Sequence, residues 1–287
     1  MCCGQLAAQE ALPDECAADA EQAPASYGRL VLIIDDLGHS LTMGKAALSL
    51  PGKLNFAVIP YTPHGRRIAA SAHRQGKEVM LHAPMSTIGQ DPLGPGGLSP
   101  ELSRKEFRNT LADALDQYPE VVGINNHMGS DLTQRRTQMA WVMQELRWRD
   151  LYFVDSRTSH NSVAANVASE FSVPHLTRHV FLDHEPTTEN IHARFQEALA
   201  RVKRRGYGVA IGHPYPQTLR YLERALPQLE EQGVRLAYVS EMLGRTGPRY
   251  AHNNLPALAM SDEMPCDDEE RVADVLEGPS ISAPEET

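Results

Sequence analysis

Eight short apolar runs along residues 30–239 constrain the fold of this chain more than any other feature. Each run is four to six residues long and is closed by a polar residue, a glycine or a proline. Continuous runs of this length are typical of parallel strands buried on both faces, because a strand with one face in water alternates apolar and polar side chains. The runs are Leu30–Ile34, Leu54–Ile59, Glu78–Leu81, Val121–Ile124, Leu151–Val154, His179–Leu182, Gly208–Ile211 and Arg235–Val239.

The intervals between these runs have the length of strand–helix–strand units. Successive runs end about 22 to 30 residues apart, with one interval of about 45 residues. We therefore predict an α/β fold, a closed or nearly closed (β/α) barrel of 7–8 mainly parallel strands. An open doubly wound sheet is the alternative. Helical periodicity is present over Arg104–Asp116, Thr137–Arg149, Thr188–Arg205 and Gln217–Glu231.

Charge separates a central body from two acidic flanks. Residues 1–27 hold five acidic residues and no lysine or arginine, and residues 261–287 hold ten acidic residues and one arginine. The rest of the chain is mildly basic, although the whole chain has a formal charge of −10. Segments so poor in apolar surface do not fold alone. We predict one domain over residues 28–245 between disordered segments 1–27 and 246–287. All four cysteines lie in these two segments, so the body has no disulfide.

The sequence shows neither a membrane span nor a secretory signal. No stretch approaches the roughly 18 apolar residues of a spanning helix. The first 27 residues lack a basic start followed by an apolar stretch. Two interpretations stay open: a cytoplasmic protein, or a chain that begins downstream of an export signal. The mildly basic body suits an anionic or neutral substrate and does not indicate nucleic-acid binding. The oligomeric state is not predicted.

Acidic, amide and histidine side chains follow the apolar runs. In a barrel of parallel strands the carboxyl ends meet at one face, where active sites form. A single Asp after a strand often caps a helix, and a single His is often structural; their convergence at one face predicts a polar pocket. The Gly- and Pro-rich loop 86–100 is expected to form a lid or a wall beside it. The residues are Asp35, Asp36, His82, Asn125, Asn126, His127, Asp155, Ser156, Arg157, Asp183 and His213.

The adjacent carboxylates Asp35 and Asp36 indicate metal-assisted hydrolysis. Consecutive residues point in different directions, so one carboxylate can ligate a metal while the other faces the substrate. One oxygen and two imidazole ligands suit Zn²⁺ or a similar divalent ion and leave a position open for water. That water loses a proton near neutral pH, a neighbouring carboxylate acts as general base, and a histidine can protonate the leaving group.

The motifs, taken in order, resemble those of a known family. IIDDLG, LHAPM, NNHMGS, VDSRT, VFLD and IGHPY, within residues 29–244, are similar to motifs of the divergent polysaccharide deacetylases, a branch of the NodB-like carbohydrate esterases. Six such segments in order are specific, although each alone is weak. The resemblance implies a distorted (β/α) barrel and a metal-dependent deacetylase. It also implies that Asp35 is the catalytic base, Asp36 a metal ligand and His213 the general acid.

The metal histidines depart from the pattern of that family, which has His-x-x-x-His after the third strand. Here Ser86 stands four residues after His82, and Asp131 stands four residues after His127. We therefore predict that two neighbouring strands contribute one histidine each. The predicted ligands of a divalent ion, Zn²⁺, are Asp36, His82 and His127.

Three functions stay open at this point. The resemblance favours a hydrolase that removes an acyl group from an amino sugar of a polysaccharide or peptidoglycan-like glycan in the periplasm or cell envelope. A catalytically altered protein on the same fold, non-catalytic or weakly catalytic, that binds glycan, and hydrolysis of another amide or ester, are the alternatives. Phosphate-binding and serine-hydrolase motifs are missing. The predicted glycan contacts are Asn125, Asn126, Asp155, Ser156, Arg157 and Asp183, of which Arg157 suits a carboxylate.

Overall fold

The computed structural model of the chain describes residues 27–245, which contain one sheet of nine strands. Each of the eight predicted runs overlaps a strand, whereas β6 was not predicted because its three residues include one apolar side chain. The four cysteines and the flanks predicted to be disordered, apart from Tyr27, lie outside the described residues. The strands are β1 Gly28–Leu37, β2 Asn55–Val58, β3 Glu78–Met85, β4 Val121–Met128, β5 Tyr152–Asp155, β6 His175–Thr177, β7 Val180–Phe181, β8 Tyr207–Gly212 and β9 Val234–Ala237.

The strand order requires the sheet to curl into a barrel. All pairs are parallel in the order β6-β5-β4-β3-β2-β1-β8-β7, and β9 pairs with the first half of β1. Only Arg178 and His179 join the edge strands β6 and β7, and this link spans no more than about 10 Å. Their amides bond to opposite edges, Arg178 N to Asp155 O and His179 N to Val209 O, both at 2.9 Å. The two edges therefore meet at a narrow seam, which confirms the distorted barrel and excludes the open sheet.

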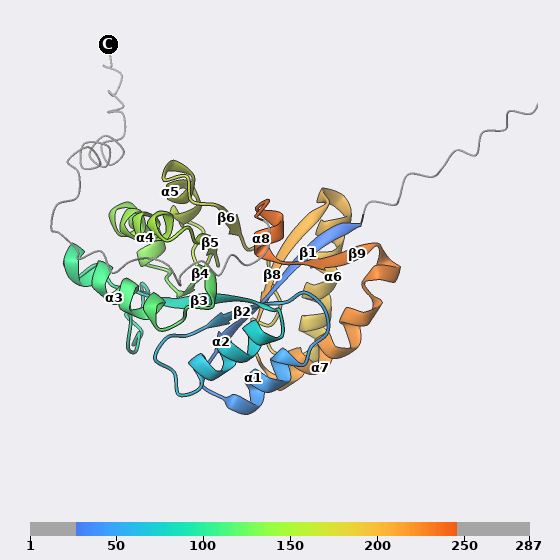
Figure 1. Cartoon of the computed structure of the whole chain (residues 1–287). Coiled ribbons are helices and arrows are strands. Elements are labelled where there is room, and N and C mark those ends of the chain that lie inside the picture. Colours follow the sequence, from blue (N-terminus) through green and yellow to red (C-terminus); the bar gives the residue numbers. More distant parts are fainter. Residues whose placement is uncertain (1–26, 246–287) are drawn as a thin grey trace, which may run out of the picture.

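Helices cover the outer face of the curled sheet (Figure 1). Two predicted helices, α3 and α6, have the predicted bounds, and α4 is displaced by one residue. The prediction over 217–231 was wrong beyond Ala225, because Pro227 lacks an amide hydrogen and the chain continues in 3-10 turns. The helices are α1 Leu41–Leu48, α2 Gly65–Arg74, α3 Arg104–Asp116, α4 Arg136–Trp148, α5 Ala164–Glu170, α6 Thr188–Arg205, α7 Pro216–Ala225 and α8 Val239–Met242.

The buried apolar side chains form two layers, one on each face of the sheet. Leu30, Leu32 and Ile34 of β1 belong to the large cluster shared with the helices. Val31 and Ile33 belong to a smaller cluster of inward-facing side chains inside the barrel. Both faces of the strand are buried from solvent, which explains why the runs are continuously apolar.

The inner layer changes character toward the carboxyl ends of the strands. Side chains two residues apart share one face of a strand. The positions that follow the inner apolar residues are occupied by ionisable side chains, so the candidate site is the continuation of the barrel interior. On three strands the inner position passes from Ile33 to Asp35, from Met80 to His82 and from Ile211 to His213.

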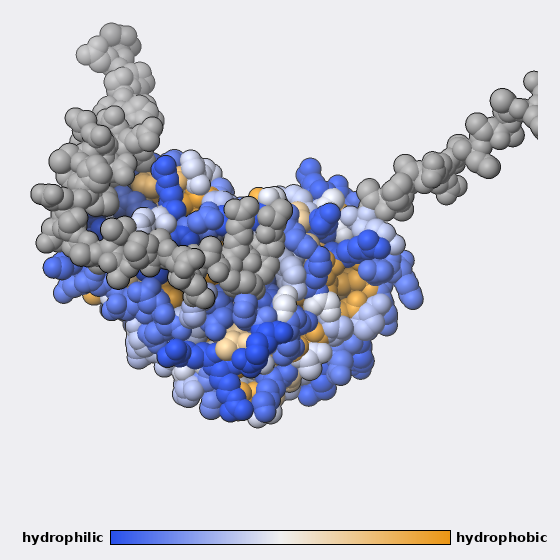
Figure 2. All heavy atoms as spheres, in the orientation of Figure 1, coloured by the Kyte–Doolittle hydropathy of each residue, from blue (hydrophilic) through white to orange (hydrophobic). Residues whose placement is uncertain are grey.

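The surface seen in Figure 2 is mainly hydrophilic, with small separate hydrophobic areas. Among residues 27–245, no helix combines the length and the apolar character needed to cross a membrane.

A buried carboxylate closes the amino-terminal side of the barrel interior. Glu78 is 1% exposed, and it accepts hydrogen bonds from the Tyr152 hydroxyl at 2.8 Å, from Ser240 N at 3.1 Å and from Ser240 Oγ. Burial raises the pKa of Glu78, and the hydrogen bonds from Ser240 and Tyr152 offset only part of that effect.

Replacing Glu78 by glutamine should reduce the loss of stability that follows a rise in pH. A carboxyl whose pKa is higher in the folded chain stabilises the fold fully below its unfolded pKa, and this contribution is lost as the pH rises through the folded pKa. Upward from pH 4.5, the unfolding midpoint of the wild type should therefore fall more than that of Glu78→Gln. Exposed Glu231→Gln is the control, and identical pH curves for wild type and Glu78→Gln would contradict the prediction.

Candidate metal and catalytic site

Asp35 and Asp36 face the same site because the end of β1 is irregular. In a regular strand, neighbouring side chains point to opposite faces. The pairing of β1 with β2 shifts register between Ile34 and Leu37, and Asp36 has a φ of 55°, a conformation that is uncommon for residues with a Cβ. As a result both carboxylates approach His82 Nε2, Asp36 at 3.1 Å and Asp35 at 3.7 Å.

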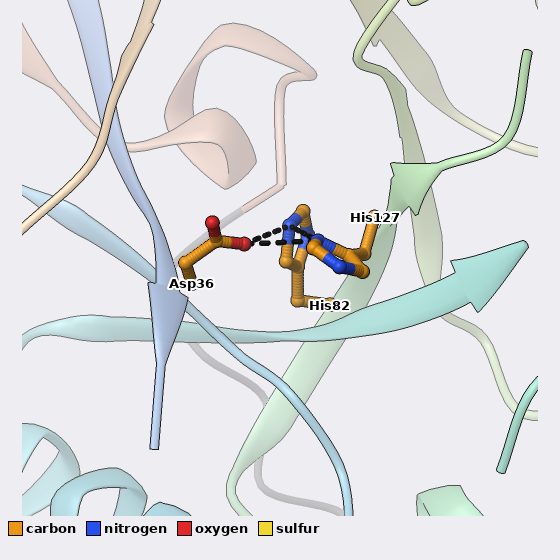
Figure 3. Close-up of side chains that lie close together, drawn as sticks. All are labelled: Asp36, His82 and His127. Carbon is orange, nitrogen blue, oxygen red and sulfur yellow. Dashed lines mark hydrogen bonds and ion pairs between the residues drawn. The ribbon is translucent and has the colours of Figure 1, made fainter. Parts of the chain in front are cut away.

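Three donor atoms from three strands meet at this point (Figure 3). Asp36 Oδ1 lies 3.1 Å from His82 Nε2 and 2.9 Å from His127 Nδ1, and the two nitrogens are 3.1 Å apart. Donors on one tetrahedral Zn²⁺ are separated by about 3.3 Å. Asp36 Oδ1 is also buried without a hydrogen bond of regular geometry. The residues present therefore fit a divalent ion, and the structure brings together the three side chains that were predicted to hold one.

Asn125 fixes the orientation of both Asp35 and His82. Its Nδ2 donates to Asp35 Oδ1 at 2.8 Å, and its Oδ1 is 2.7 Å from His82 Nδ1. Because an ionised carboxylate can only accept, the amide must present its oxygen to His82, so Nδ1 of the imidazole carries the proton. The lone pair of neutral His82 is then on Nε2, which faces Asp36. Asn125 was predicted to contact glycan, but it is fully buried and its side chain bonds to His82 and Asp35 instead.

The electrostatics of the site favour a cation. Burial raises the pKa of Asp35, and His82 and His213 counteract part of this rise. Burial alone would also raise the pKa of Asp36, but His127 and His82 hold it well below its usual value. Burial would lower the pKa of His82, but Asp35 and Asp36 raise it to about 9. The two carboxylates that attract a proton to this imidazole would equally attract a metal ion.

His213 is held by a carboxylate on the neighbouring strand end. Its Nδ1 lies 2.8 Å from Asp183 Oδ1, and Asp183 Oδ2 accepts from His213 N and from Thr218 Oγ1, both at 2.7 Å. Its Nε2 faces the site, 3.8 Å from Asp36 Oδ2. Burial would lower the pKa of His213, but Asp183 raises it. Asp183 was predicted to contact substrate, but its side chain orients His213 and raises the pKa of its imidazole.

The remaining predicted glycan contacts lie at the ends of β4 and β5 and directly after β5. Asn126 Oδ1 accepts from Ser156 N at 2.8 Å, and its Nδ2 donates to a backbone carbonyl. Asp155 accepts from Arg157 N at 2.7 Å and from Ser162 Oγ at 2.8 Å. These two side chains hold the loops in place. Arg157 is exposed, and its role toward substrate stays a prediction.

The two positions without the expected histidine bond to each other. Ser86 Oγ donates to Asp131 Oδ2 at 2.8 Å, and Asp131 also pairs with Arg135 at 2.9 Å. Ser86 N bonds to Leu98 O at 3.0 Å, which closes the base of loop 86–100. Ser86 and Asp131 therefore anchor the long loop, and the candidate metal donors come from separate strands.

Three residues beside His213 were missed by the sequence reasoning. Phe181 and Tyr215 contact the His213 ring, with centroids at 5.0 and 5.6 Å, and Thr218 donates a hydrogen bond to Asp183. Phe181 also lines a cavity of about 290 Å³ at the seam. Tyr215 stands within the IGHPY segment, so proximity to His213 could have identified it, but nothing in the sequence pairs Thr218 with Asp183.

The fold and the site define a curled α/β barrel protein with a candidate metal site at the carboxyl ends of its strands. The family model for divergent polysaccharide deacetylases matches residues 32–243, and the chain belongs to this family.

Two uncharacterized proteins are similar to the chain in sequence, and one solved structure has the same fold. The chain is 36% identical to the uncharacterized protein YibQ of Escherichia coli (strain K12) over 239 residues, which covers 83% of this chain and 74% of that protein. It is 33% identical to an uncharacterized protein of Haemophilus influenzae over 206 residues, 72% of this chain and 74% of the other. The crystal structure of the uncharacterized protein ATU2773 from Agrobacterium tumefaciens C58 has the same fold, with a TM-score of 0.71 and 21% identity, over 77% of this chain and 91% of that one.

Proposed function

We propose that this protein is a metal-dependent hydrolase that removes an acyl group from an amino sugar of a cell-envelope polysaccharide. The observation that carries the proposal is the meeting of Asp36 Oδ1, His82 Nε2 and His127 Nδ1 beside a buried acid, Asp35, and a carboxylate-bound histidine, His213. Family membership supports a polysaccharide as the class of substrate.

Asp36, His82 and His127 would hold the divalent ion, for which Zn²⁺ suits one oxygen and two imidazole donors. When bound, such an ion lowers the pKa of a coordinated water and polarises a carbonyl oxygen.

Asp35 is suited to the role of general base. Its Oδ1 is occupied by Asn125, which leaves Oδ2 directed toward His82 and the ligand cluster. Because burial raises the pKa of Asp35, this carboxylate holds a proton more readily than an exposed one. In the proposed reaction Oδ2 takes the proton of the water whose oxygen bonds to the acyl carbon.

His213 is suited to the role of general acid. Asp183 holds Nδ1, so Nε2 is the nitrogen that faces the site and can give up a proton. That proton goes to the amide nitrogen as the carbon–nitrogen bond breaks. The products are a carboxylic acid and the free amino sugar.

The direct test is acetate release from oligomers of N-acetylglucosamine. The purified protein should contain close to one divalent ion per chain, lose activity with a chelator, and regain it when Zn²⁺ is added. A protein that contains no ion and gains nothing from Zn²⁺ would rule out the metal-dependent hydrolase.

The alternative is a glycan-binding protein without catalysis. The same oligomers distinguish the two functions, because binding measured by calorimetry does not depend on turnover. Wild-type protein that binds the oligomers and releases no acetate, with or without Zn²⁺, would establish the binding function.

We expect Asp183→Asn to lower kcat on the order of 10²-fold with little change in Zn²⁺ content. The variant removes the carboxylate that orients His213 Nδ1. Its amide NH2 group would face groups that donate hydrogen bonds to Asp183 in the wild type, such as His213 N and Thr218 Oγ1. Thr218→Val should have a smaller effect, because Asp183 keeps both bonds to His213. Equal kcat in wild type and Asp183→Asn would show that His213 does not depend on this contact.

The proposed substrate implies a location in the periplasm or cell envelope, with a polysaccharide or peptidoglycan-like glycan as the partner. Fractionation of cells that express the full natural gene, followed by detection of this chain in each fraction, tests the location. Detection in the cytoplasm alone would contradict it.

A further inference from the structure

The exposed aromatic side chains of residues 27–245 differ in what covers their rings. Tyr215 is 42% exposed, and its ring contact is with His213, at 5.6 Å between centroids and 37° between planes. The other exposed rings have partners remote from the catalytic histidine: an arginine lies over Tyr27, Trp148 and Tyr207 at 3.8, 5.4 and 5.9 Å, and Gly96 packs against Tyr61.

Tyr215 is held in a defined position although it is exposed. It lies between Pro214 and Pro216, whose rings restrict the backbone, and it is the N-cap residue of α7. Its side chain makes no capping hydrogen bond, and its hydroxyl has no hydrogen-bond partner within residues 27–245. The ring is therefore positioned by the restricted backbone and by its contact with His213, while its hydroxyl has no hydrogen-bond partner among residues 27–245.

The distance to His213 determines which part of a substrate Tyr215 can reach. The leaving nitrogen must come within hydrogen-bond reach of His213 Nε2, at about 3 Å. The sugar ring that carries this nitrogen is one bond further away. Phe181 and Tyr215 both lie against the His213 ring, with centroids at 5.0 and 5.6 Å, and Tyr215 is the more exposed of the two. The sugar ring would thus approach His213 on the side of Tyr215.

We propose that Tyr215 forms a stacking subsite for the pyranose ring that carries the acyl group. This inference rests on the proposed function and assigns a residue that selects its substrate. The C–H face of a pyranose is flat and apolar, and a tyrosine ring offers matching area with little loss of side-chain freedom. Burial, Asp36 and Asp183 raise the pKa of Tyr215, so its hydroxyl stays protonated and can donate to a sugar oxygen.

The test measures binding of the trimer of N-acetylglucosamine by calorimetry in the presence of a chelator, so that no turnover occurs. We expect Tyr215→Ala and Tyr215→Leu to bind about tenfold more weakly than wild type, and Tyr215→Phe to stay within about twofold. Tyr207→Ala is the matched control, because Tyr207 is an exposed tyrosine at the start of β8 whereas Tyr215 follows its end. Binding by Tyr207→Ala should match wild type.

Saturation-transfer NMR gives a signal that would not arise if Tyr215 only supported the fold. Saturation of the Tyr215 ring protons should reach the ring protons of the bound trimer in wild type and be absent in Tyr215→Leu. Unfolding midpoints of both substitutions identify a folding defect, and the trimer is then compared on the variant that folds.

Two results would overturn the stacking subsite: wild-type affinity in both Tyr215→Ala and Tyr215→Leu, or no binding of the trimer by wild type at millimolar concentration. Failure of the proposed function has a different signature. Binding that depends on Tyr215 without acetate release would reject the hydrolase and retain the subsite.

Discussion

Replacing Asp36 by asparagine is expected to remove Zn²⁺ binding and acetate release together. Within residues 27–245, Asp36 contributes the oxygen donor of the one cluster with metal-binding geometry. Asparagine has the same shape and tolerates the left-handed backbone at φ 55°, so the fold is retained while the charge is lost. We expect the affinity for Zn²⁺ to fall by more than about 100-fold, beyond the loss typical of residues that only support a ligand. Competition with a chelating dye measures this affinity.

The control for Asp36→Asn is Asp131→Asn. Asp131 stands four residues after His127, but its carboxylate is bonded to Ser86 and Arg135. Asp131→Asn should therefore keep its Zn²⁺. If Asp131→Asn lost the ion while Asp36→Asn retained it, the ligand set would be different from the one proposed.

Replacing Asp35 by asparagine is expected to separate catalysis from metal binding. Acetate release should fall by about 10²- to 10⁴-fold, the contribution of a positioned general base. Zn²⁺ content should stay close to that of the wild type, because Asp35 Oδ2 is 3.7 Å from His82 Nε2 and is outside the cluster of donors. An asparagine at this position still offers an oxygen to Asn125 Nδ2, which keeps the buried contact.

Asp35→Asn and Asp36→Asn form a matched pair, since the two changes are chemically identical and adjacent in the chain. Metal analysis, acetate release and unfolding midpoints are measured on both. Retention of more than about one tenth of wild-type activity by Asp35→Asn would exclude its role as the general base. Loss of Zn²⁺ from Asp35→Asn would instead make it a ligand.

The barrel could be predicted in outline because both faces of its strands are buried from solvent. Residues 30–34 of β1 supply both apolar layers, so they form a continuous run that the sequence displays directly. Strand β6 could not be predicted in this way, because its residues His175–Thr177 are all partly exposed. It also does not reach α1 and α5, which have eight and seven residues, too few for a clear helical period.

The residues of the site could be predicted better than the hydrogen bonds that connect them. Strand ends identified Asp35, Asp36, His82, His127 and His213, and the structure places all five close together. Their chemical roles stay predictions. The assignment of Asn125 and Asp183 to glycan did not anticipate that each is bonded to a histidine of the site. Those bonds join residues 43 and 30 positions apart, and no local pattern reports them.

The sequence by itself determined which side chains reach the carboxyl end of the barrel, because the two-residue period of a strand continues from buried apolar positions to the polar residues after them. Only the tertiary structure decided which of these atoms meet. Asp36 turns toward His82 through a register shift and a left-handed residue, and His127 reaches them because β4 pairs with β3 with Pro84 opposite His127. Register depends on the packing of the whole sheet rather than on nearby residues, and so the candidate metal site exists only in the folded barrel.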